Sequence, residues 1–414
     1  MIRENKSIVE KEDMFYLPGL YLMMLHHNIP LLGTNIQWIG AAICALFLII
    51  SPRKYTDKAY VIWVASFMFF FSLSVLWSIK IKTSVFVLVV RLIPLLLLTF
   101  ATMKYICSQR RLNNVLFAVF LCSFFMILAI IPNFDEVMMG FRLGNALNEE
   151  ADGEKIWNSN TIAITLCFAL YAGWIFFMNK NKGFGLKLLY IITAIVFLFF
   201  ILVSGSRKSL LMIAIPMMYF LYKKYKRNFL IYMIVSFFAL AFVYYLVMRV
   251  ELFYSILGSR IEAAMLILSG DYTSGEVDDS RYYLAMYGLE WAQDNPILGV
   301  GINCYRVLSN ATLKFSGYNF YAHNNYIELL VDVGIVGLII YYSGLFYLLR
   351  KSLKRNDQVG SWVFILLVVT FVLDMFHVAY YEINNHLLLV ILFKILVLDK
   401  QQSLLKLKKA YFNV

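Results

Sequence analysis

Residues 83–103, TSVFVLVVRLIPLLLLTFATM, are the stretch of sequence that decides the fold class. The run is apolar apart from a few hydroxyl residues, Pro94 and one arginine, Arg91. A hydrocarbon core of about 30 Å needs roughly 20 such residues in a helix. Because lipid offers no water to the backbone, a helix must satisfy its own polar groups. The stretch therefore predicts a transmembrane helix that carries one charge inside the membrane.

Similar runs recur along the whole chain. Of its 414 residues, 61% are hydrophobic, 17% are aromatic and 15% are charged, which is not typical of a soluble domain. Short polar segments separate the runs, and the alternating pattern of a membrane barrel does not occur. We predict an all-α polytopic integral membrane protein with about 12 transmembrane helices. The expected spans are 14–31, 36–50, 60–78, 83–103, 112–132, 160–178, 186–203, 207–222, 228–248, 325–349, 360–381 and 385–399. The first is short and polar enough to be interfacial or re-entrant instead.

Basic residues set the expected orientation, because Lys and Arg are retained on the cytoplasmic side during insertion. Clusters such as 223–227 and 350–355 fall between spans that alternate in direction. The net charge of +12 therefore reflects basic loops that set the orientation in the membrane, and no nucleic-acid partner is expected. Both termini are predicted to be cytoplasmic. The outer turn with Lys80 and Lys82 is an exception that this topology does not explain. The five cysteines form no disulfide framework, and residues 1–13 do not suggest a removable signal peptide.

One long segment divides the chain. Residues 249–324 are the longest non-spanning stretch and are predicted to be a large extracytoplasmic loop between the ninth and tenth spans; a loop of that length is usually functional. Aromatic residues at helical spacing between Tyr282 and Trp291 predict a helix at the headgroup level. We expect N-terminal transmembrane helices over 1–135, a central core that includes the long loop over 136–349, and C-terminal helices with a basic tail over 350–414.

The predicted eighth span begins with a candidate anion site. The sequence Ser204 to Ser209 reads SGSRKS, which places Ser206 at an N-cap and Arg207 and Lys208 in the first turn. Free amides and the helix dipole favour a phosphate at such a position. The alternative is an arginine that only extends to the interface.

The tenth span opens with YAHNNYIE, from Tyr321 to Glu328. A histidine at the span's outer end can accept a hydroxyl proton near neutral pH, so His323 is the candidate base. Asn324, Glu328 and Asp332 share one helix face by four-residue spacing. At about 1.5 Å per residue, Asp332 lies roughly 13 Å below His323, which favours a structural role. We expect Glu328 to support the site.

Three motifs in this order resemble the O-antigen ligase and Wzy-type polysaccharide polymerase family. They are Ser206-Arg207, then Arg281 upstream of Asn295-Pro296 and Gly299-x-Gly301, then His323-Asn324 leading to Asp332-x-Gly334-x-x-Gly337. The resemblance implies a GT-C-like fold in the bacterial inner membrane, with an extracytoplasmic active site. It also implies metal-independent, inverting transfer of a glycan from undecaprenyl diphosphate to a sugar hydroxyl, without a cofactor.

The resemblance assigns roles to matching positions. It implies that Arg207 and Arg281 serve the diphosphate and that His323 serves the acceptor. The further substrate-binding candidates are Asn324, Glu328, Arg91, Lys208 and Tyr321. Arg91 is expected either to bind a lipid phosphate or to pair with Glu328 or Asp332, and the pairing is favoured. Asp278-Asp279 is interpreted as a charge partner of Arg281, and no metal is predicted.

The expected function is a repeat-unit polymerase for O-antigen or capsule. The alternative is an O-antigen ligase that moves finished glycan onto lipid A-core or another acceptor. A lipid-linked oligosaccharide flippase or transporter is disfavoured, because such proteins concentrate polar residues near the midplane of repeated halves. The expected partners are the undecaprenyl-diphosphate-linked oligosaccharide, the lipid bilayer, and a chain-length regulator and flippase of the same pathway.

Overall fold

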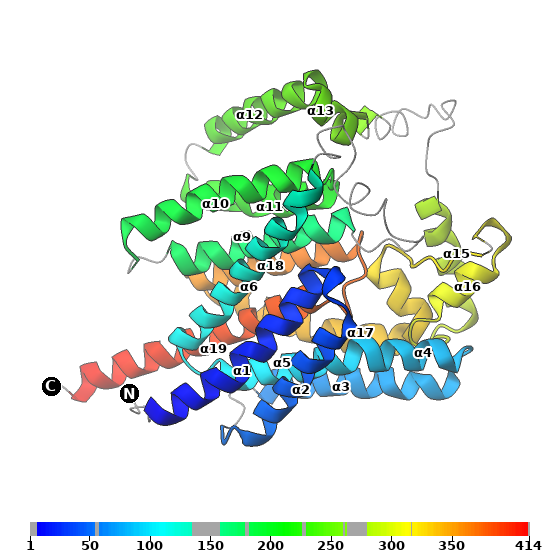
Figure 1. Ribbon diagram of the computed structural model, residues 1–414, viewed down its shortest axis with the longest axis horizontal. Helices are drawn as coiled ribbons and strands as arrows, with labels where there is room; N and C mark the ends of the chain where they lie inside the picture. The colour runs from blue at the N-terminus through cyan, green and yellow to red at the C-terminus, as the bar shows by residue number, and fades with distance from the viewer. Residues whose placement is uncertain are drawn as a thin grey trace. The chain divides into compact units, whose positions relative to one another are not determined.

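The structure is a computed structural model whose described residues are helical or irregular, with no strand among them (Figure 1). The described residues are 6–53, 58–134, 158–178, 182–225, 229–259, 261–262, 280–315 and 317–412. A helix occurs at each predicted span, with its ends shifted by a few residues in most cases, because long apolar runs satisfy their backbone groups most readily as helices. Residues 135–157, between the fifth and sixth predicted spans, and residues 263–279 of the long loop lie outside the described residues.

Among the described residues, six helical segments are long and apolar enough to cross a membrane. These are Lys58–Trp77, Ile81–Tyr105, Gln109–Ile130, Ser159–Phe177, Phe184–Val203 and Asn325–Leu353. Shorter apolar helices occur at Thr34–Ile50, Gln358–Asp374 and Ile383–Leu398. This composition is that of a polytopic membrane protein. The count of twelve crossings stays a prediction.

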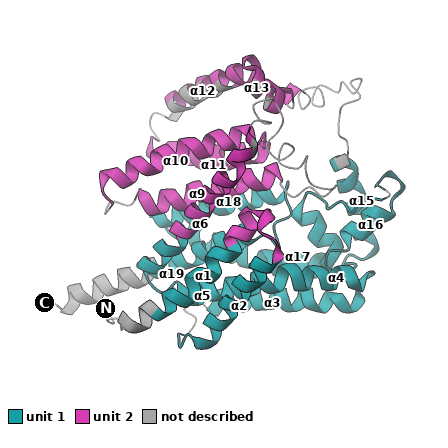
Figure 2. Cartoon of the chain, in the orientation of Figure 1, with its two compact units in different colours: residues 1–23, 35–115, 279–414 teal, residues 24–34, 116–278 magenta. Residues whose placement is uncertain are grey.

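The chain divides into two compact units (Figure 2). Unit 1 comprises residues 1–23, 35–115 and 279–414, and unit 2 comprises residues 24–34 and 116–278. The helices of unit 1 are α1 (Lys6–Asn28, to residue 23), α2 (Thr34–Ile50), α3 (Lys58–Leu73), η2 (Ser74–Trp77), α4 (Ile81–Val87), η3 (Leu88–Leu92), α5 (Ile93–Tyr105), α15 (Ser280–Asp294), α16 (Tyr305–Ala311), η7 (Leu313–Phe315), α17 (Asn325–Leu353), α18 (Gln358–Asp374) and α19 (Ile383–Phe412). Helix α6 (Gln109–Ile130) begins in unit 1 and continues into unit 2.

Helix α17 is the centre of unit 1, where it packs against α3, α15 and α18. Trp63 links α3 to α17, because its indole N–H donates to the carbonyl of Tyr341 in α17 at 2.8 Å. The close approach depends on Gly344, where an added Cβ would lie 2.2 Å from the Trp63 ring. A small residue in α17 therefore allows the large indole of α3 to pack against its backbone.

A kink in α17 receives the loop that precedes α16. Gly334 has φ 64° and ψ −172°, which interrupts the helix and frees backbone groups. The loop pairs with them, since the amide of Val300 donates to Val331 at 2.9 Å and that of Ile335 donates to Pro296 at 2.9 Å. An added Cβ on Gly334 would lie 2.2 Å from the carbonyl oxygen of Ile297. Only glycine suits this position, in both backbone angle and space.

The backbone turns tightly after Asn295-Pro296. Gly299 and Gly301 have φ values of 67° and 104°, and the amide of Gly301 donates to the Asp332 carbonyl at 2.8 Å. The loop is thus fixed on α17 at a defined depth.

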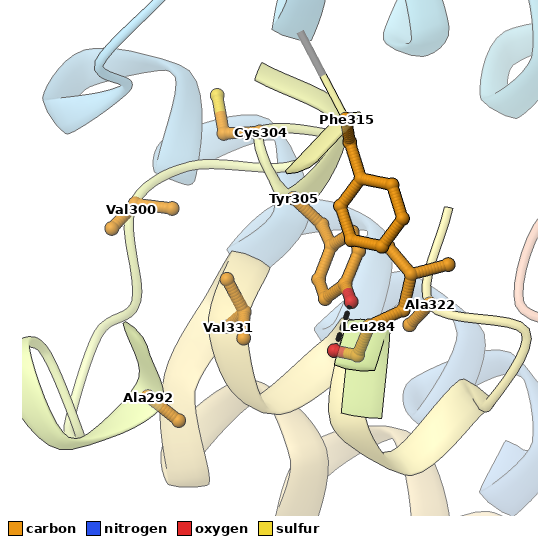
Figure 3. Close-up of a cluster of buried hydrophobic side chains, with 8 residues drawn as sticks. All are labelled: Leu284, Ala292, Val300, Cys304, Tyr305, Phe315, Ala322 and Val331. Carbon is orange, nitrogen blue, oxygen red and sulfur yellow. Dashed lines mark hydrogen bonds between the residues drawn. The ribbon is translucent and has the colours of Figure 1, made fainter. Parts of the chain in front are cut away.

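The described part of the long loop has its own hydrophobic core (Figure 3). Tyr305 of α16 is fully buried there, and its hydroxyl donates to the carbonyl of Leu284 in α15 at 2.5 Å. Helix α15, predicted from its aromatic spacing, is present and packs against α17. The core gathers Leu284, Ala292, Val300, Cys304, Tyr305, Phe315, Ala322 and Val331. Residues 280–315 therefore form a packed cap on the beginning of α17.

Unit 2 is built on α9 (Ser159–Phe177), which packs against α10 (Phe184–Val203) and α11 (Arg207–Lys224). The hydroxyl of Tyr171 in α9 donates to the Met212 carbonyl of α11. Only residues 204–206 connect α10 to α11, and Gly205 has φ 62° there. The other elements of the unit are η1 (Pro30–Leu32), η4 (Ile131–Asn133), α12 (Phe229–Arg249), α13 (Glu251–Phe253) and η6 (Tyr254–Gly258).

Candidate active site

His323 lies in a turn that leads into α17. Its φ of 55° is the left-handed conformation, which few residues other than glycine adopt. The next residue, Asn324, is the N-cap, and its Oδ1 accepts the amides of Tyr326 and Ile327 at 3.0 and 3.1 Å. The imidazole is half-buried and lies 3.9 Å from the Tyr321 ring, centroid to centroid. Strained backbone of this kind is frequent at functional sites.

Glu328 holds the His323 turn from below. Its side chain is fully buried, and Oε2 accepts the amide of Ala322 at 2.8 Å. Among the described residues, Oε1 has no hydrogen-bond partner. A buried carboxylate that lacks partners is costly, so this position is poised for an additional donor. The direct contact is with the backbone next to His323, and substrate binding by Glu328 stays a prediction.

Asp332, one turn further along α17, sets the start of α16. Its two carboxylate oxygens accept the amides of Asn303 and Tyr305, each at 2.7 Å. Asn303 itself has φ 62°. A carboxylate near the first amides of a helix satisfies donors that the helix cannot satisfy itself. Asp332 thereby fixes the residue that follows Tyr305, which is Arg306.

Arg306 is a site residue that sequence analysis did not identify. Its guanidinium donates to Asn303 Oδ1 at 3.0 Å, to the Asn319 carbonyl at 3.4 Å and to the Tyr381 hydroxyl at 2.9 Å. Its Cζ also lies 5.0 Å from the centre of the Tyr321 ring. Burial alone would lower the pKa of Arg306, but Tyr381 and the Glu328 carboxylate raise it above its ordinary value. The side chain is therefore held, and held as a cation, beside the pair of Tyr321 and His323.

Arg91 reaches the same tyrosine from the membrane side. Its Cζ lies 4.7 Å from the centre of the Tyr381 ring, and the side chain is exposed. The expected ion pair with Glu328 or Asp332 does not occur within the described residues. Both carboxylates are fully buried whereas the Arg91 side chain is exposed, so the Arg91 charge acts on Glu328 without a direct ion pair.

Arg281, in the first turn of α15, is exposed, and its charge acts on the Tyr321 hydroxyl. Burial raises the pKa of Tyr321 above its ordinary value, while the charges of Arg306 and Arg281 oppose that rise. Arg281 therefore lies within electrostatic range of the His323 turn. Asp278 and Asp279, its expected charge partners, are outside the described residues.

Arg207 and Lys208 form the first turn of α11 in unit 2. Arg207 is exposed and Lys208 is buried. Ser206 takes the N-cap position without a side-chain cap bond, and its buried Oγ has no hydrogen-bond partner among the described residues. The start of α11 is where the sequence placed it. The convergence of Arg207 with His323 stays a prediction, because Arg207 belongs to unit 2 and His323 to unit 1.

Comparison with known families bears on these residues. Residues 192–342 match a family model described as O-Antigen ligase. The chain is similar to that family over this range, which includes Arg207, Arg281, Arg306 and His323 and excludes Arg91 and Tyr381. No curated protein matches the chain.

The O-Antigen ligase match supports a membrane enzyme of the ligase and polymerase type that acts on lipid-linked glycans. It agrees with the apolar helices and with polar side chains gathered at the beginning of α17. The match makes no distinction between the transfer of single repeat units and of finished chains.

Proposed function

We propose that the protein is a polysaccharide repeat-unit polymerase of the bacterial inner membrane. It transfers glycan from undecaprenyl diphosphate to a sugar hydroxyl at the extracytoplasmic face. The observation that carries the proposal is the His323 turn. A left-handed histidine is held by a buried carboxylate and packs against Tyr321, which lies within range of the Arg281 charge. This arrangement supports His323 as the proton acceptor, with the charges of Arg281 and Arg306 nearby.

The proposed reaction is an inverting displacement. An acceptor hydroxyl attacks the anomeric carbon, a new glycosidic bond forms, and the bond from that carbon to the diphosphate oxygen breaks. The hydroxyl proton passes to the imidazole of His323. The leaving diphosphate gains negative charge, which the guanidinium groups of Arg281 and Arg207 stabilise. No metal is required in this scheme.

Tyr321, Asn324 and Lys208 complete the proposed substrate contacts. Tyr321 offers an aromatic ring beside His323. Asn324, the residue after His323, offers a side-chain amide nitrogen. Lys208 follows Arg207 in the first turn of α11. Planar groups of this kind suit sugar hydroxyls, and the lysine adds positive charge.

Transfer of finished glycan to lipid A-core is the second candidate, favoured by the description of the matched family. A glycan gel from a deletion strain separates the two. Loss of the polymerase leaves products with a single repeat unit, whereas loss of a ligase leaves long chains on the lipid carrier. Complementation with the wild-type gene and failure with His323→Ala would support the proposed site. An unaltered gel in the deletion strain would remove both functions.

A further inference from the structure

Arg91 is placed unusually for an intramembrane charge. It lies in the π-helical turn η3, inside the candidate span Ile81–Tyr105. π-Turns within helices are frequently found at functional sites. An ionisable residue at this depth normally faces a partner or a pathway. Within the described residues, its guanidinium contacts the Tyr381 ring, and no hydrogen-bond acceptor or carboxylate satisfies its N–H groups. Those donors are open to a ligand.

Tyr381 brings a second guanidinium to the same place. Arg91 lies over the ring face, while Arg306 donates to the hydroxyl at 2.9 Å. The tyrosine is 7% exposed. Its backbone is fixed because Asn325 Oδ1 accepts the neighbouring amides of Ala379 and Tyr380 at 2.9 and 3.1 Å. Two cations from distant parts of the chain are thus held at one rigid phenol.

Two carboxylates lie within electrostatic range of the same tyrosine. Glu328 and Glu382 act on Tyr381 electrostatically, as do Arg306 and Arg91. Arg281 adds a third cation within range of Tyr321. Within the described part of the chain Glu328 forms no ion pair with Arg91, and it is buried beneath the turn. Open guanidinium donors on the membrane side, next to a fixed cation on the loop side, suit an anion carried by a lipid.

We propose that Arg91 and Arg306, held at the face and hydroxyl of Tyr381, bind a phosphate-bearing lipid headgroup. Guanidinium groups match phosphate oxygens through paired N–H donors. A polyprenyl diphosphate donor and an ordinary anionic phospholipid present the same chemistry. Naming the donor as the occupant rests on the proposed function, whereas the phosphate site does not.

The test measures lipid affinity directly. The full-length protein is placed in phosphatidylcholine nanodiscs, and the binding of undecaprenyl diphosphate is titrated. Arg91→Gln and Arg306→Gln should each weaken binding about tenfold, the size expected for one charge-assisted contact. The double variant should lose less than the two single losses combined, because one ligand shares both contacts. Arg110→Gln, which alters an exposed arginine paired with Asp13, is the matched control and should bind as the wild type does.

A second titration identifies the source of the phosphate. Phosphatidylglycerol replaces undecaprenyl diphosphate as the probe. Weakened binding of the diphosphate alone assigns the site to the donor, and weakened binding of both probes assigns it to lipid phosphate in general. Unchanged affinity for both probes in folded Arg91→Gln and Arg306→Gln overturns the proposal. If Arg306→Gln does not fold, Arg306→Lys keeps the charge and removes the fork, and Tyr381→Phe removes only the hydroxyl that Arg306 contacts.

Glycan transfer is assayed in parallel, so that the two proposals fail separately. Normal transfer by the wild type with unchanged lipid affinity in both arginine variants would end the inference and leave the function. Loss of affinity in those variants, from a protein that transfers no glycan, would keep the phosphate site and end the proposed function. His323→Ala should retain lipid affinity, because Tyr381, Asn303 and Asn319 hold the two guanidinium groups in place.

Discussion

The carboxylate of Asp332 in α17 accepts the backbone amide of Tyr305 in α16 at 2.7 Å. Its other oxygen accepts the amide of Asn303 at the same distance. This relationship connects a transmembrane helix to the loop above it. The buried carboxylate of Asp332 therefore determines the position of Arg306, although Asp332 itself makes no contact with His323 or Tyr321 among the described interactions.

The first prediction follows from this contact. Asp332→Asn replaces one acceptor oxygen with an amide that can only donate, so one buried backbone N–H loses its partner. We expect the free energy of unfolding to fall by roughly 2–3 kcal/mol and glycan transfer to fall with it, as Arg306 shifts. Thermal unfolding in detergent and a transfer assay measure the two effects. Asp294→Asn, at the exposed end of α15, is the control and should change neither. Wild-type stability in Asp332→Asn would contradict the assignment.

The second prediction concerns the kink in α17. Gly334→Ala adds a Cβ that lies 2.2 Å from the carbonyl of Ile297 and also forces alanine to φ 64°. We expect a loss of more than about 3 kcal/mol in the free energy of unfolding, because the strain and the collision add. Gly317→Ala is a matched control with φ 89° and no neighbour within 4 Å, so it should lose only about 1 kcal/mol. Equal melting temperatures for the two variants would show that the loop does not press on the kink.

The third prediction tests the candidate base. His323→Ala removes the imidazole and leaves Glu328 and its contact with Ala322 in place. We expect the rate of glycan transfer to fall about 100-fold or more, the usual effect of losing a general base. Immunoblotting of membranes should find the protein at wild-type abundance. His27→Ala, near the end of α1, provides the control histidine. Full transfer by His323→Ala would remove the proposed base.

The fourth prediction separates geometry from charge at the start of α11. Arg207→Lys keeps the positive charge and removes the fork that binds two phosphate oxygens together. We expect the turnover rate to fall about tenfold or more, with little change in stability. Lys223→Arg, a charge-conserving exchange in the last turn of the same helix, should leave turnover unchanged. Wild-type kinetics in Arg207→Lys would indicate that charge alone suffices.

The helices, including the start of α17 at Asn325, could be predicted because their signals are local. An apolar run such as 83–103 specifies a helix by itself, and the glycines at 299 and 301 indicate a tight turn after Pro296. Arg306 has no such signal. It follows a short irregular stretch, and Tyr381, which its guanidinium contacts, is 75 positions away. Sequence spacing could not reveal that contact.

Arg91 shows the opposite limit. Its position inside an apolar run drew attention to it, but the described residues show no direct ion pair with either expected carboxylate, and the Arg91 charge acts on Glu328 only electrostatically. Sequence favoured pairing with Glu328 or Asp332, because opposite charges in a membrane usually meet. Both carboxylates instead serve backbone amides of the loop. The Arg91 guanidinium instead lies over the ring of Tyr381. The two residues are nearly 300 positions apart, and no sequence pattern predicts a cation–π contact over that separation.

The fifth prediction concerns a charge network in unit 1, far along the sequence from the His323 turn. Glu12 accepts hydrogen bonds from Arg111 at 2.6 Å, from Arg53 at 2.7 Å and from Ser51 at 2.8 Å. Arg111 is fully buried. Burial would raise the pKa of Glu12, but these three hydrogen bonds outweigh it and hold the pKa below its ordinary value.

A lowered pKa fixes the direction of the pH effect. The folded state binds the Glu12 proton less readily than the unfolded chain does, so the network stabilises the protein above the ordinary glutamate pKa. That stability is lost as the pH falls through the lowered pKa. Glu12→Gln should cost roughly 3 kcal/mol at neutral pH, because it leaves Arg111 buried without its carboxylate. Thermal unfolding from pH 7 to pH 3 should show the gap between wild type and variant closing only at the acid end. A gap that stays constant over the whole range would mean that the ion pairs contribute nothing.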